Sequence, residues 1–190
     1  MGEPTPTLAR GAPSAAPPML AFVGKKHVGK TTWVVQVSAE LTRRGRRVMI
    51  LKHGSHTFNL DPSGTDTYRH YHEGHAARVA MASPDKFALV SRWAEERTPE
   101  AIAAEFLADA DLVLCEGFKR SALPKVEIFR SAAHLSSLWA DGIGDVTTWR
   151  AMVTDAPPPG FPGAIFPVEP ATGVPALCDW IETAFLPPIR

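Results

Sequence analysis

The chain has 190 residues, 45% of them hydrophobic, and its 20 Lys and Arg residues equal its 20 Asp and Glu residues in number. This length and apolar content suit one globular domain with a core of its own. A formal net charge of zero argues against a nucleic-acid-binding protein, which generally carries a surplus of positive charge. No apolar run approaches the roughly 20 residues that span a bilayer, and the N-terminus lacks the pattern of a signal peptide. We therefore expect a cytoplasmic protein that does not bind membranes.

Residues 1–17 are rich in Pro, Ala and Gly and have no apolar face, which predicts a disordered tail. A single domain is then expected over residues 18–190. The two cysteines, Cys115 and Cys178, match no metal-binding or redox spacing, and they predict buried thiols in a reducing compartment.

Short apolar runs alternate along the chain with helical patterns. In chain order, strands are predicted at residues 19–23, 46–52, 77–83, 86–93, 111–115, 125–129 and 149–155. Helices are predicted from about Thr31, from Thr65 to Glu73, from Thr98, and from Val174 to Phe185. Strands that alternate with helices indicate an α/β fold, with a mostly parallel sheet flanked by helices and right-handed crossovers.

Some of these elements carry a prediction about burial. The run Arg46–Lys52 is apolar enough to predict a strand buried on both faces. The helix after Thr98 has that threonine as its N-cap and a proline in its first turn. Ile102 and Phe106 are expected on its buried face. The run Lys125–Phe129 alternates between polar and apolar residues, which is the pattern of a further strand.

The stretch GKKHVGKTTW, residues 24–33, follows the first predicted strand and matches the phosphate-binding pattern G-x-x-x-x-G-K-[ST] in full. Its glycines allow backbone N–H groups to turn inward around phosphates, and the N-terminus of the following helix adds partial positive charge. Lys30 is expected to reach the β- and γ-phosphates, and the Thr31 hydroxyl to hold Mg²⁺. The candidate nucleotide-binding residues of this loop are Gly24, Lys25, Lys26, His27, Val28, Gly29, Lys30, Thr31 and Thr32. A glycine-rich turn without a ligand is the alternative.

Lys25, directly after the first glycine of the motif, has two interpretations. In one branch of the phosphate-loop proteins, a lysine at this place reaches the nucleotide across a dimer. A solvated lysine is the simpler interpretation and the one that we favour.

A phosphate loop needs a carboxylate nearby to hold Mg²⁺ or its waters. Glu116 directly follows the apolar run Asp111–Cys115, and ligands of open parallel sheets bind at the carboxyl ends of the strands. Glu116 is therefore predicted to face the phosphates, to share Mg²⁺ with Thr31 and to orient a water for hydrolysis. The alternative is an acid at a strand end that merely faces water.

A histidine-rich stretch, KHGSHTFNLDPSGTDTYRHYHEGH at residues 52–75, begins at the end of the second predicted strand. Its histidine spacings match no standard zinc pattern and no cysteine assists, so a zinc site is the less favoured alternative. The favoured interpretation is a polar loop at the edge of the nucleotide site. In this loop Asp61 and Asp66 are candidates to orient water or metal, and Gly64 is expected in a turn.

Three stretches together resemble one family: GKKHVGKTTW, LKHGSHTFNLDPSGTDTYR and DLVLCEGFKRSALPKVEIFR. They resemble the MobB family of molybdopterin-guanine dinucleotide biosynthesis adapter proteins, over most of the chain from about Met19 to Asp155. The resemblance implies a phosphate-loop NTPase-type fold, in the dimer-prone branch of the signal-recognition and MinD-like proteins. It also implies GTP binding, slow GTP hydrolysis, a homodimer, and assistance to MobA, the guanylyltransferase that joins GMP to molybdopterin.

The resemblance assigns further residues to the site. Those carried over as lining it are Lys52, His53, Asp61, Gly64, Asp66 and Lys119. Asp155 lies where such folds often read the base, and a carboxylate there would prefer guanine over adenine. Contact between molybdopterin and the histidine-rich stretch is left open. The chain departs from the family pattern at Ser55, Asn59, Thr65 and His75, which predicts weaker phosphate or metal binding by this stretch.

Two other classes of function fit a phosphate loop. A small-molecule kinase or ligase uses the same scaffold but usually carries an arginine-bearing lid, and no long lid follows Glu116. A pure binding module would hold the nucleotide as a structural or regulatory ligand. Phosphate transfer to an added acceptor separates the kinase from the GTP-binding adapter.

Overall fold

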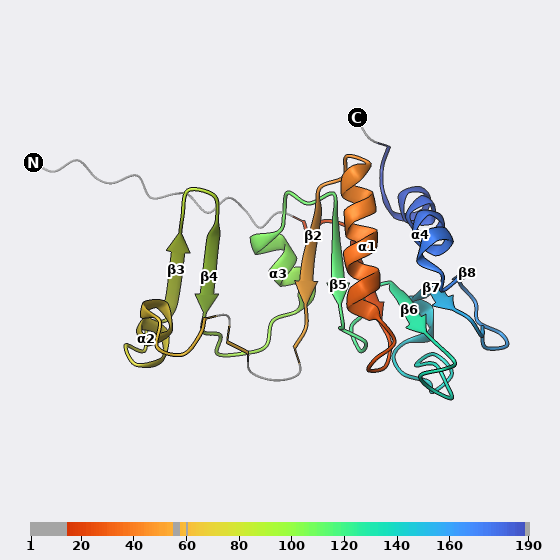
Figure 1. Ribbon diagram of the computed structural model, residues 1–190, viewed down its shortest axis with the longest axis horizontal. Coiled ribbons are helices and arrows are strands. Elements are labelled where there is room, and N and C mark those ends of the chain that lie inside the picture. Colours follow the sequence, from red (N-terminus) through yellow and green to blue (C-terminus); the bar gives the residue numbers. More distant parts are fainter. Residues whose placement is uncertain (1–14, 55–57, 60, 189–190) are drawn as a thin grey trace, which may run out of the picture. The chain divides into compact units, whose positions relative to one another are not determined.

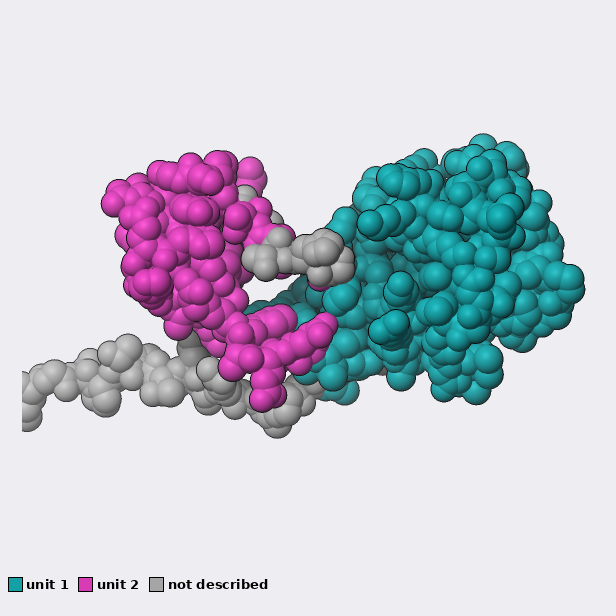
Figure 2. Space-filling view, turned by 90° about the horizontal axis from the view of Figure 1, so that it is seen from below, with its two compact units in different colours: residues 1–53, 98–190 teal, residues 54–97 magenta. Residues whose placement is uncertain are grey.

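The computed structural model describes residues 15–54, 58–59 and 61–188 (Figure 1). Its contacts divide the chain into two compact units, one made of residues 1–53 and 98–190 and the other of residues 54–97 (Figure 2). Most of the predicted tail, residues 1–14, lies outside the described residues. Within the described residues, no helix has the length and apolar character to cross a membrane.

The first unit is built on a six-stranded sheet in which all neighbouring strands are parallel. The strand order is β2-β5-β1-β6-β7-β8 (Figure 1). The bounds are Met19–Val23 for β1, Val48–Lys52 for β2, Leu112–Glu116 for β5, Lys125–Phe129 for β6, Trp149–Thr154 for β7 and Ala164–Phe166 for β8. The predicted α/β fold with a mostly parallel sheet is confirmed. The sequence patterns missed the short strand β8, which lies in a segment rich in proline and glycine.

Helices cover both faces of this sheet. Their bounds are Lys30–Arg43 for α1, Pro99–Phe106 for α3 and Pro170–Phe185 for α4, and a 3-10 helix, η1, spans Val146–Thr148. Along β1, Leu20 and Phe22 belong to the core cluster that includes α1 and α4. Ala21, between them, belongs to the cluster that includes Ala103 of α3. Alternate residues of β1 therefore face opposite helical layers, as expected for a doubly covered sheet.

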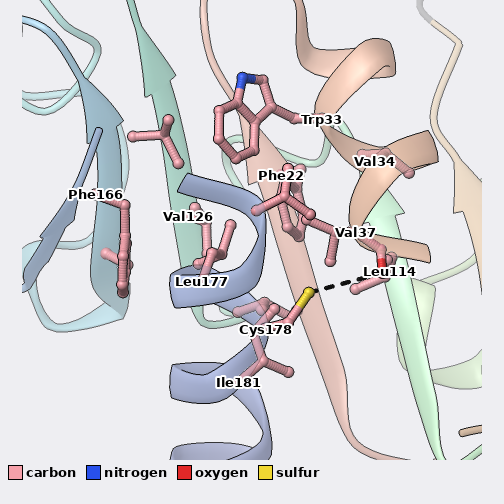
Figure 3. Close-up of a cluster of buried hydrophobic side chains, with 14 of the residues drawn as sticks. Phe22, Trp33, Val34, Val37, Leu114, Val126, Phe166, Leu177, Cys178 and Ile181 are labelled. Carbon is pink, nitrogen blue, oxygen red and sulfur yellow. Dashed lines mark hydrogen bonds between the residues drawn. The ribbon is translucent and has the colours of Figure 1, made fainter. Parts of the chain in front are cut away.

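The core between α1 and α4 contains one of the two cysteines. Figure 3 shows Cys178 between Leu177 and Ile181 of α4, with its sulfur directed at the Val37 carbonyl of α1, 3.9 Å away. Cys115 is buried in β5, and both cysteines are free, as the sequence predicted. Burial raises the pKa of each thiol to about 12.

Two predictions about burial were wrong. β2 is the last strand on its side of the sheet, so it is only half-buried, and Ile50 is 44% exposed. α3 turns Pro99 and Ala103 inward rather than the larger Ile102 and Phe106, and Phe106 is 39% exposed. A small alanine at the contact allows this short helix to lie close to the sheet. The last helix begins at Pro170, about one turn before its predicted start.

All five residues of β6 are buried, although their sequence alternates between polar and apolar. The strand lies between β1 and β7, so Lys125 is buried with the rest. Its ammonium donates hydrogen bonds to the Ser121 carbonyl (2.6 Å), the Leu123 carbonyl (3.1 Å) and the Thr148 hydroxyl (2.8 Å). Burial lowers the pKa of Lys125, and the three hydrogen bonds offset part of the cost of removing its charge from water.

The described residues of the second unit form one helix and a two-stranded antiparallel sheet. Their bounds are Asp66–His72 for α2, Arg78–Ala82 for β3 and Phe87–Ser91 for β4. The Thr65 hydroxyl caps α2 by accepting a hydrogen bond from the Tyr68 N–H at 3.4 Å. The Arg92 guanidinium lies over the Tyr71 ring, 4.1 Å from its centre. The helix and the two strands confirm the elements predicted for this part of the chain.

Gly173 sets how closely α4 approaches α1. A Cβ at this position would lie 2.2 Å from the Pro167 carbonyl oxygen and 2.7 Å from the Trp33 ring. We expect Gly173→Ala to destabilise the protein by about 1–3 kcal/mol, even though alanine is the better helix former. Chemical denaturation measures the change, with Ala171→Ser, an exposed substitution on the same helix, as the control. A Gly173→Ala variant as stable as the native chain would contradict this close packing.

Candidate functional site

The phosphate-binding motif forms the loop between β1 and α1. Gly24 has a φ of 150°, and a Cβ there would lie 2.5 Å from the Ile128 carbonyl oxygen of β6. Gly29 has a φ of 89° and is the N-cap of α1. His27, between them, also adopts a left-handed conformation, with a φ of 63°. The first glycine is therefore required by a close backbone approach and the second by a left-handed conformation.

Lys30, the first residue of α1, turns its ammonium back toward the loop and donates a hydrogen bond to the Lys25 carbonyl at 2.7 Å. Burial lowers the pKa of Lys30; the charge of Glu116 opposes this effect, and the charges of Lys52 and Lys119 add to it. Three ammonium groups therefore act on the same space beside one carboxylate. Such a surplus of positive charge suits a polyanionic ligand.

The Thr31 hydroxyl donates a hydrogen bond to a carboxylate oxygen of Glu116 at 2.6 Å. The Lys52 ammonium lies 3.4 Å from the same oxygen. The order of the strands explains this cluster, because β5 lies between β1 and β2 and pairs Glu116 with both Phe22 and Lys52. The structure thus brings together three residues that the sequence proposed for one site, and it buries the acid.

The chain turns sharply after Glu116, through left-handed conformations at Gly117 (φ 100°) and Phe118 (φ 55°). The His53 N–H donates a hydrogen bond to the Glu116 carbonyl at 3.0 Å, and the His53 ring lies 4.9 Å from the Phe118 ring. A Cβ on Gly117 would lie 3.2 Å from that of His53. His53 therefore packs against the turn that carries Lys119, and it lies at the carboxyl end of β2, as the sequence predicted.

Asp155 follows β7, at the same edge of the parallel sheet as the phosphate loop. Its carboxylate accepts a hydrogen bond from the Ser131 N–H at 2.8 Å, and this bond lowers the pKa of Asp155. An ionised acceptor at this edge is what a base-reading role requires. The role itself stays a prediction.

The predicted residues Asp61, Gly64 and Asp66 belong to the second unit. Gly64 has a φ of 88° in a turn, and Asp66 is the first residue of α2. Their roles toward water or metal stay predictions. His56 of the zinc alternative lies outside the described residues, and within residues 15–54, 58–59 and 61–188 no three His, Cys, Asp or Glu side chains gather as metal ligands would.

Lys25 is not the solvated residue that the favoured interpretation expected. Its ammonium lies 2.7 Å from a carboxylate oxygen of Asp141 and donates a hydrogen bond to the Ser136 hydroxyl at 3.0 Å. Its side chain is only 25% exposed. The sequence patterns missed Asp141 and Ser136, because both lie in an irregular segment with no motif and more than 100 positions from Lys25.

A hollow of about 550 Å³ lies elsewhere on the first unit. Pro124, Thr148, Arg150 and Trp180 are among its lining residues, so it opens near the amino ends of β6 and β7. The phosphate loop follows the carboxyl end of β1, and this hollow is therefore separate from the phosphate site.

The family model of molybdopterin guanine dinucleotide synthesis protein B, MobB, matches residues 19–155. The chain belongs to the MobB family. It is 34% identical over 122 residues to the molybdopterin-guanine dinucleotide biosynthesis adapter protein of Escherichia coli, a match that covers 61% of this chain and 67% of that protein. It is 32% identical over 119 residues to the Haemophilus influenzae adapter protein, covering 60% of this chain and 64% of that protein. The chain therefore spans about two thirds of the length of these relatives.

Solved MobB structures share the fold. The crystal structure of a MobB homolog from Bacillus stearothermophilus has a TM-score of 0.63 at 24% identity, covering 87% of this chain and 98% of the other. The Bacillus subtilis MobB structure has a TM-score of 0.64 at 21% identity, covering 90% and 99%. Both similarities extend beyond the 19–155 match, because they cover more of the chain than that range does.

Lys30→Ala is expected to weaken the binding of a nucleoside triphosphate by about 10- to 100-fold, because phosphate charge is left without its central partner. Isothermal titration with Mg²⁺ and GTP measures the loss. Lys86→Ala removes an exposed lysine of the second unit and serves as the control for a general loss of charge. Unchanged affinity in Lys30→Ala would contradict the assignment of the phosphate loop.

Proposed function

We propose that this member of the MobB family is a GTP-binding adapter in molybdopterin-guanine dinucleotide biosynthesis, with a slow GTPase activity. The curated relatives in Escherichia coli and Haemophilus influenzae are named adapter proteins of this biosynthesis. The nucleotide part of the proposal rests on one observation, the 2.6 Å hydrogen bond that joins Thr31 of the phosphate loop to Glu116. A Mg²⁺-nucleotide site requires at least a phosphate loop and an acid at the end of a neighbouring strand.

Thr31 and Glu116 are the residues that would hold Mg²⁺ or its waters. Both offer oxygen atoms, the donors that Mg²⁺ prefers, and Glu116 is held at the end of a buried strand with only 8% exposure. The set of donors therefore fits the ion. When bound, Mg²⁺ would neutralise part of the charge on the phosphates.

The phosphates would lie against the backbone amides of residues 24–31, at the N-terminus of α1. Lys30 would exchange the Lys25 carbonyl for phosphate oxygens. Lys52, at the end of β2, and Lys119, in the turn after Glu116, would add charge. Glu116 is the first candidate to orient the attacking water, with Asp61 and Asp66 as further candidates. Glu116 already accepts a hydrogen bond from Thr31 and lies beside Lys52, so both residues hold its carboxylate in place at the site.

The base would be read by Asp155. Its carboxylate stays ionised because the Ser131 N–H lowers its pKa, and a carboxylate can accept hydrogen bonds from N1 and the exocyclic amino group of guanine. Adenine offers no matching pair of donors. GTP is therefore the nucleotide that we propose.

Two partners complete the proposal. The adapter would assist a guanylyltransferase of the MobA type. It would also form a homodimer, and Met81 and Phe87, which are 57% and 69% exposed on opposite faces of the β3–β4 sheet, are candidate contacts for it.

A Mg²⁺ titration tests the nucleotide site. In the native chain GTP affinity is expected to rise with Mg²⁺, whereas in Thr31→Val it is expected to be nearly independent of Mg²⁺, since the variant keeps the shape of threonine without its hydroxyl. Thr183→Val, an exposed substitution near the end of α4, is the matched control. A Thr31→Val variant with the native Mg²⁺ dependence would contradict the metal role of Thr31.

The adapter role is tested by measuring GTP binding and GTP turnover in the presence of Mg²⁺, with and without the guanylyltransferase. GTP turnover that changes when the partner is added supports it. Phosphate transfer from GTP to an added small-molecule acceptor would instead favour a kinase, and nucleotide binding with no turnover under either condition would favour a pure binding module.

Asp155→Asn is expected to reduce the preference for GTP over ATP by roughly 10-fold, because it removes the charged acceptor but keeps the acceptor for the Ser131 N–H. Competition of the two nucleotides for the protein measures the ratio. Asp109→Asn, an exposed aspartate away from the sheet edge that carries the loop, is the control. An unchanged ratio would exclude Asp155 as the reader of the base.

A further inference from the structure

The phosphate loop is held on its outer side by the β6–β7 loop, residues 130–145. The Lys25 ammonium, the Ser136 hydroxyl and the Asp141 carboxylate form a closed triangle: Lys25 lies 2.7 Å from Asp141 and 3.0 Å from Ser136, and Ser136 donates to Asp141 at 2.7 Å. Hydrogen bonding to Lys25 and to Ser136 lowers the pKa of Asp141. The Lys25–Asp141 ion pair is therefore a charge-assisted contact, and the Ser136 hydroxyl fixes its geometry.

A second contact lies at the next residue. A ring nitrogen of His134 is 2.7 Å from the Lys26 carbonyl oxygen. Two consecutive residues of the phosphate loop are thus held by one segment, the first through its side chain and the second through its backbone. A side-chain contact alone would leave the backbone of the loop free to rotate, whereas the two together restrain it.

The β6–β7 loop is itself fixed to the sheet. Glu127, buried in β6, accepts hydrogen bonds from the N–H groups of Leu138 and, at 3.0 Å, of Trp139. Asp155, after β7, accepts from the Ser131 N–H. The segment that contacts Lys25 and Lys26 is therefore anchored to the middle of β6 and to the end of β7, and it can act as a rigid support.

The backbone carbonyl of Lys25 has a different partner from its side chain. Its carbonyl accepts the hydrogen bond from the Lys30 ammonium at 2.7 Å. The Lys25 ammonium instead contacts the Asp141 carboxylate at 2.7 Å and the Ser136 hydroxyl at 3.0 Å, both in the β6–β7 loop. The Lys25 side chain is thus held by the β6–β7 loop, while its carbonyl holds the Lys30 ammonium.

We infer that Lys25 is a positioning residue and not a phosphate ligand: its contact with Asp141 and Ser136 holds the phosphate loop ready for the nucleotide. This inference rests on the proposed nucleotide binding at this loop. The alternative is that Lys25 leaves Asp141 when the nucleotide binds and contacts a phosphate itself. In that case Asp141 would compete with the nucleotide for Lys25, and removing its charge would strengthen binding.

A double-mutant cycle in the full chain separates the two roles. The variants are Lys25→Met, Asp141→Asn and the combination, and GTP and GDP affinities are measured for each by titration with Mg²⁺. For a positioning role, each single variant is expected to weaken both nucleotides by the same factor, roughly 3- to 10-fold, and the double variant to be no weaker than the singles. Lys25→Arg is expected to restore most of the affinity.

Several outcomes would overturn the inference. One is a Lys25→Met variant that loses far more affinity for GTP than for GDP, because the lost contact would then be to the γ-phosphate. Others are tighter GTP binding by Asp141→Asn, or an effect of Lys25→Met that persists in full when Asp141 is already asparagine. Asp145→Asn, an exposed aspartate of the same loop, is the matched control.

Amide hydrogen exchange in the nucleotide-free protein keeps this inference separate from the proposed function. Exchange of the amides of residues 24–30 is expected to accelerate in Lys25→Met and in Asp141→Asn but not in Asp145→Asn. If these amides are unaffected, Lys25 does not position the loop, whatever the protein binds. If they accelerate while the native chain binds no guanine nucleotide, the positioning role stands and the proposed GTP site fails.

Discussion

The hydrogen bond between the Thr31 hydroxyl and Glu116 depends on the order of the strands. Thr31 follows β1 through a short loop, and Glu116 ends β5, so the two can meet only if β5 lies beside β1. Because β5 lies between β1 and β2, the same order also places Lys52 of β2 beside Glu116. The strand order therefore assembles the acid, the hydroxyl and a lysine from three distant parts of the sequence.

A second constraint comes from covering the sheet on both faces. β6 has neighbouring strands on both sides, its apolar residues Val126 and Ile128 pack in the core cluster of α1 and α4, and Glu127 lies against the β6–β7 loop. Its two charged residues must then find partners inside the protein. Lys125 is satisfied by two carbonyls and a hydroxyl, whereas Glu127 is satisfied by two backbone N–H groups of the β6–β7 loop. Burial raises the pKa of Glu127 to about 6. A residue that is costly to bury thus organises the loop that supports the phosphate-binding segment.

Local patterns predicted much of this fold because the forces behind them act between near neighbours. The apolar run of β1, the Thr98 cap of α3 and the glycines of the phosphate loop are decided within a few residues. The exposure of β2 and the full burial of β6 could not be predicted in this way, since they depend on which strands become neighbours. Ala103 faced the sheet in place of Phe106 for a similar reason, because the distance between helix and sheet is set by the whole layer.

The residues of the candidate site also differ in whether local sequence patterns could predict them. Lys30, Thr31 and Glu116 could be found because a spacing pattern and a strand end mark them in the sequence. The partners of Lys25 could not, since Ser136 is 111 positions away in a segment with no regular pattern. A motif therefore locates the groups that meet the ligand, whereas the groups that support those residues become visible only when the chain is folded.

The burial of Cys115 and Cys178 has a practical consequence. A thiol with a pKa near 12 holds almost no thiolate at neutral pH, and the thiolate is the form that alkylating reagents and oxidants attack. The two native cysteines would therefore be unreactive while the protein is folded. A dye or cross-linker would then react only with a single cysteine introduced on the surface. The same two thiols would become reactive on unfolding, so their modification would report directly on opening of the core between α1 and α4 and of the layer beneath α3.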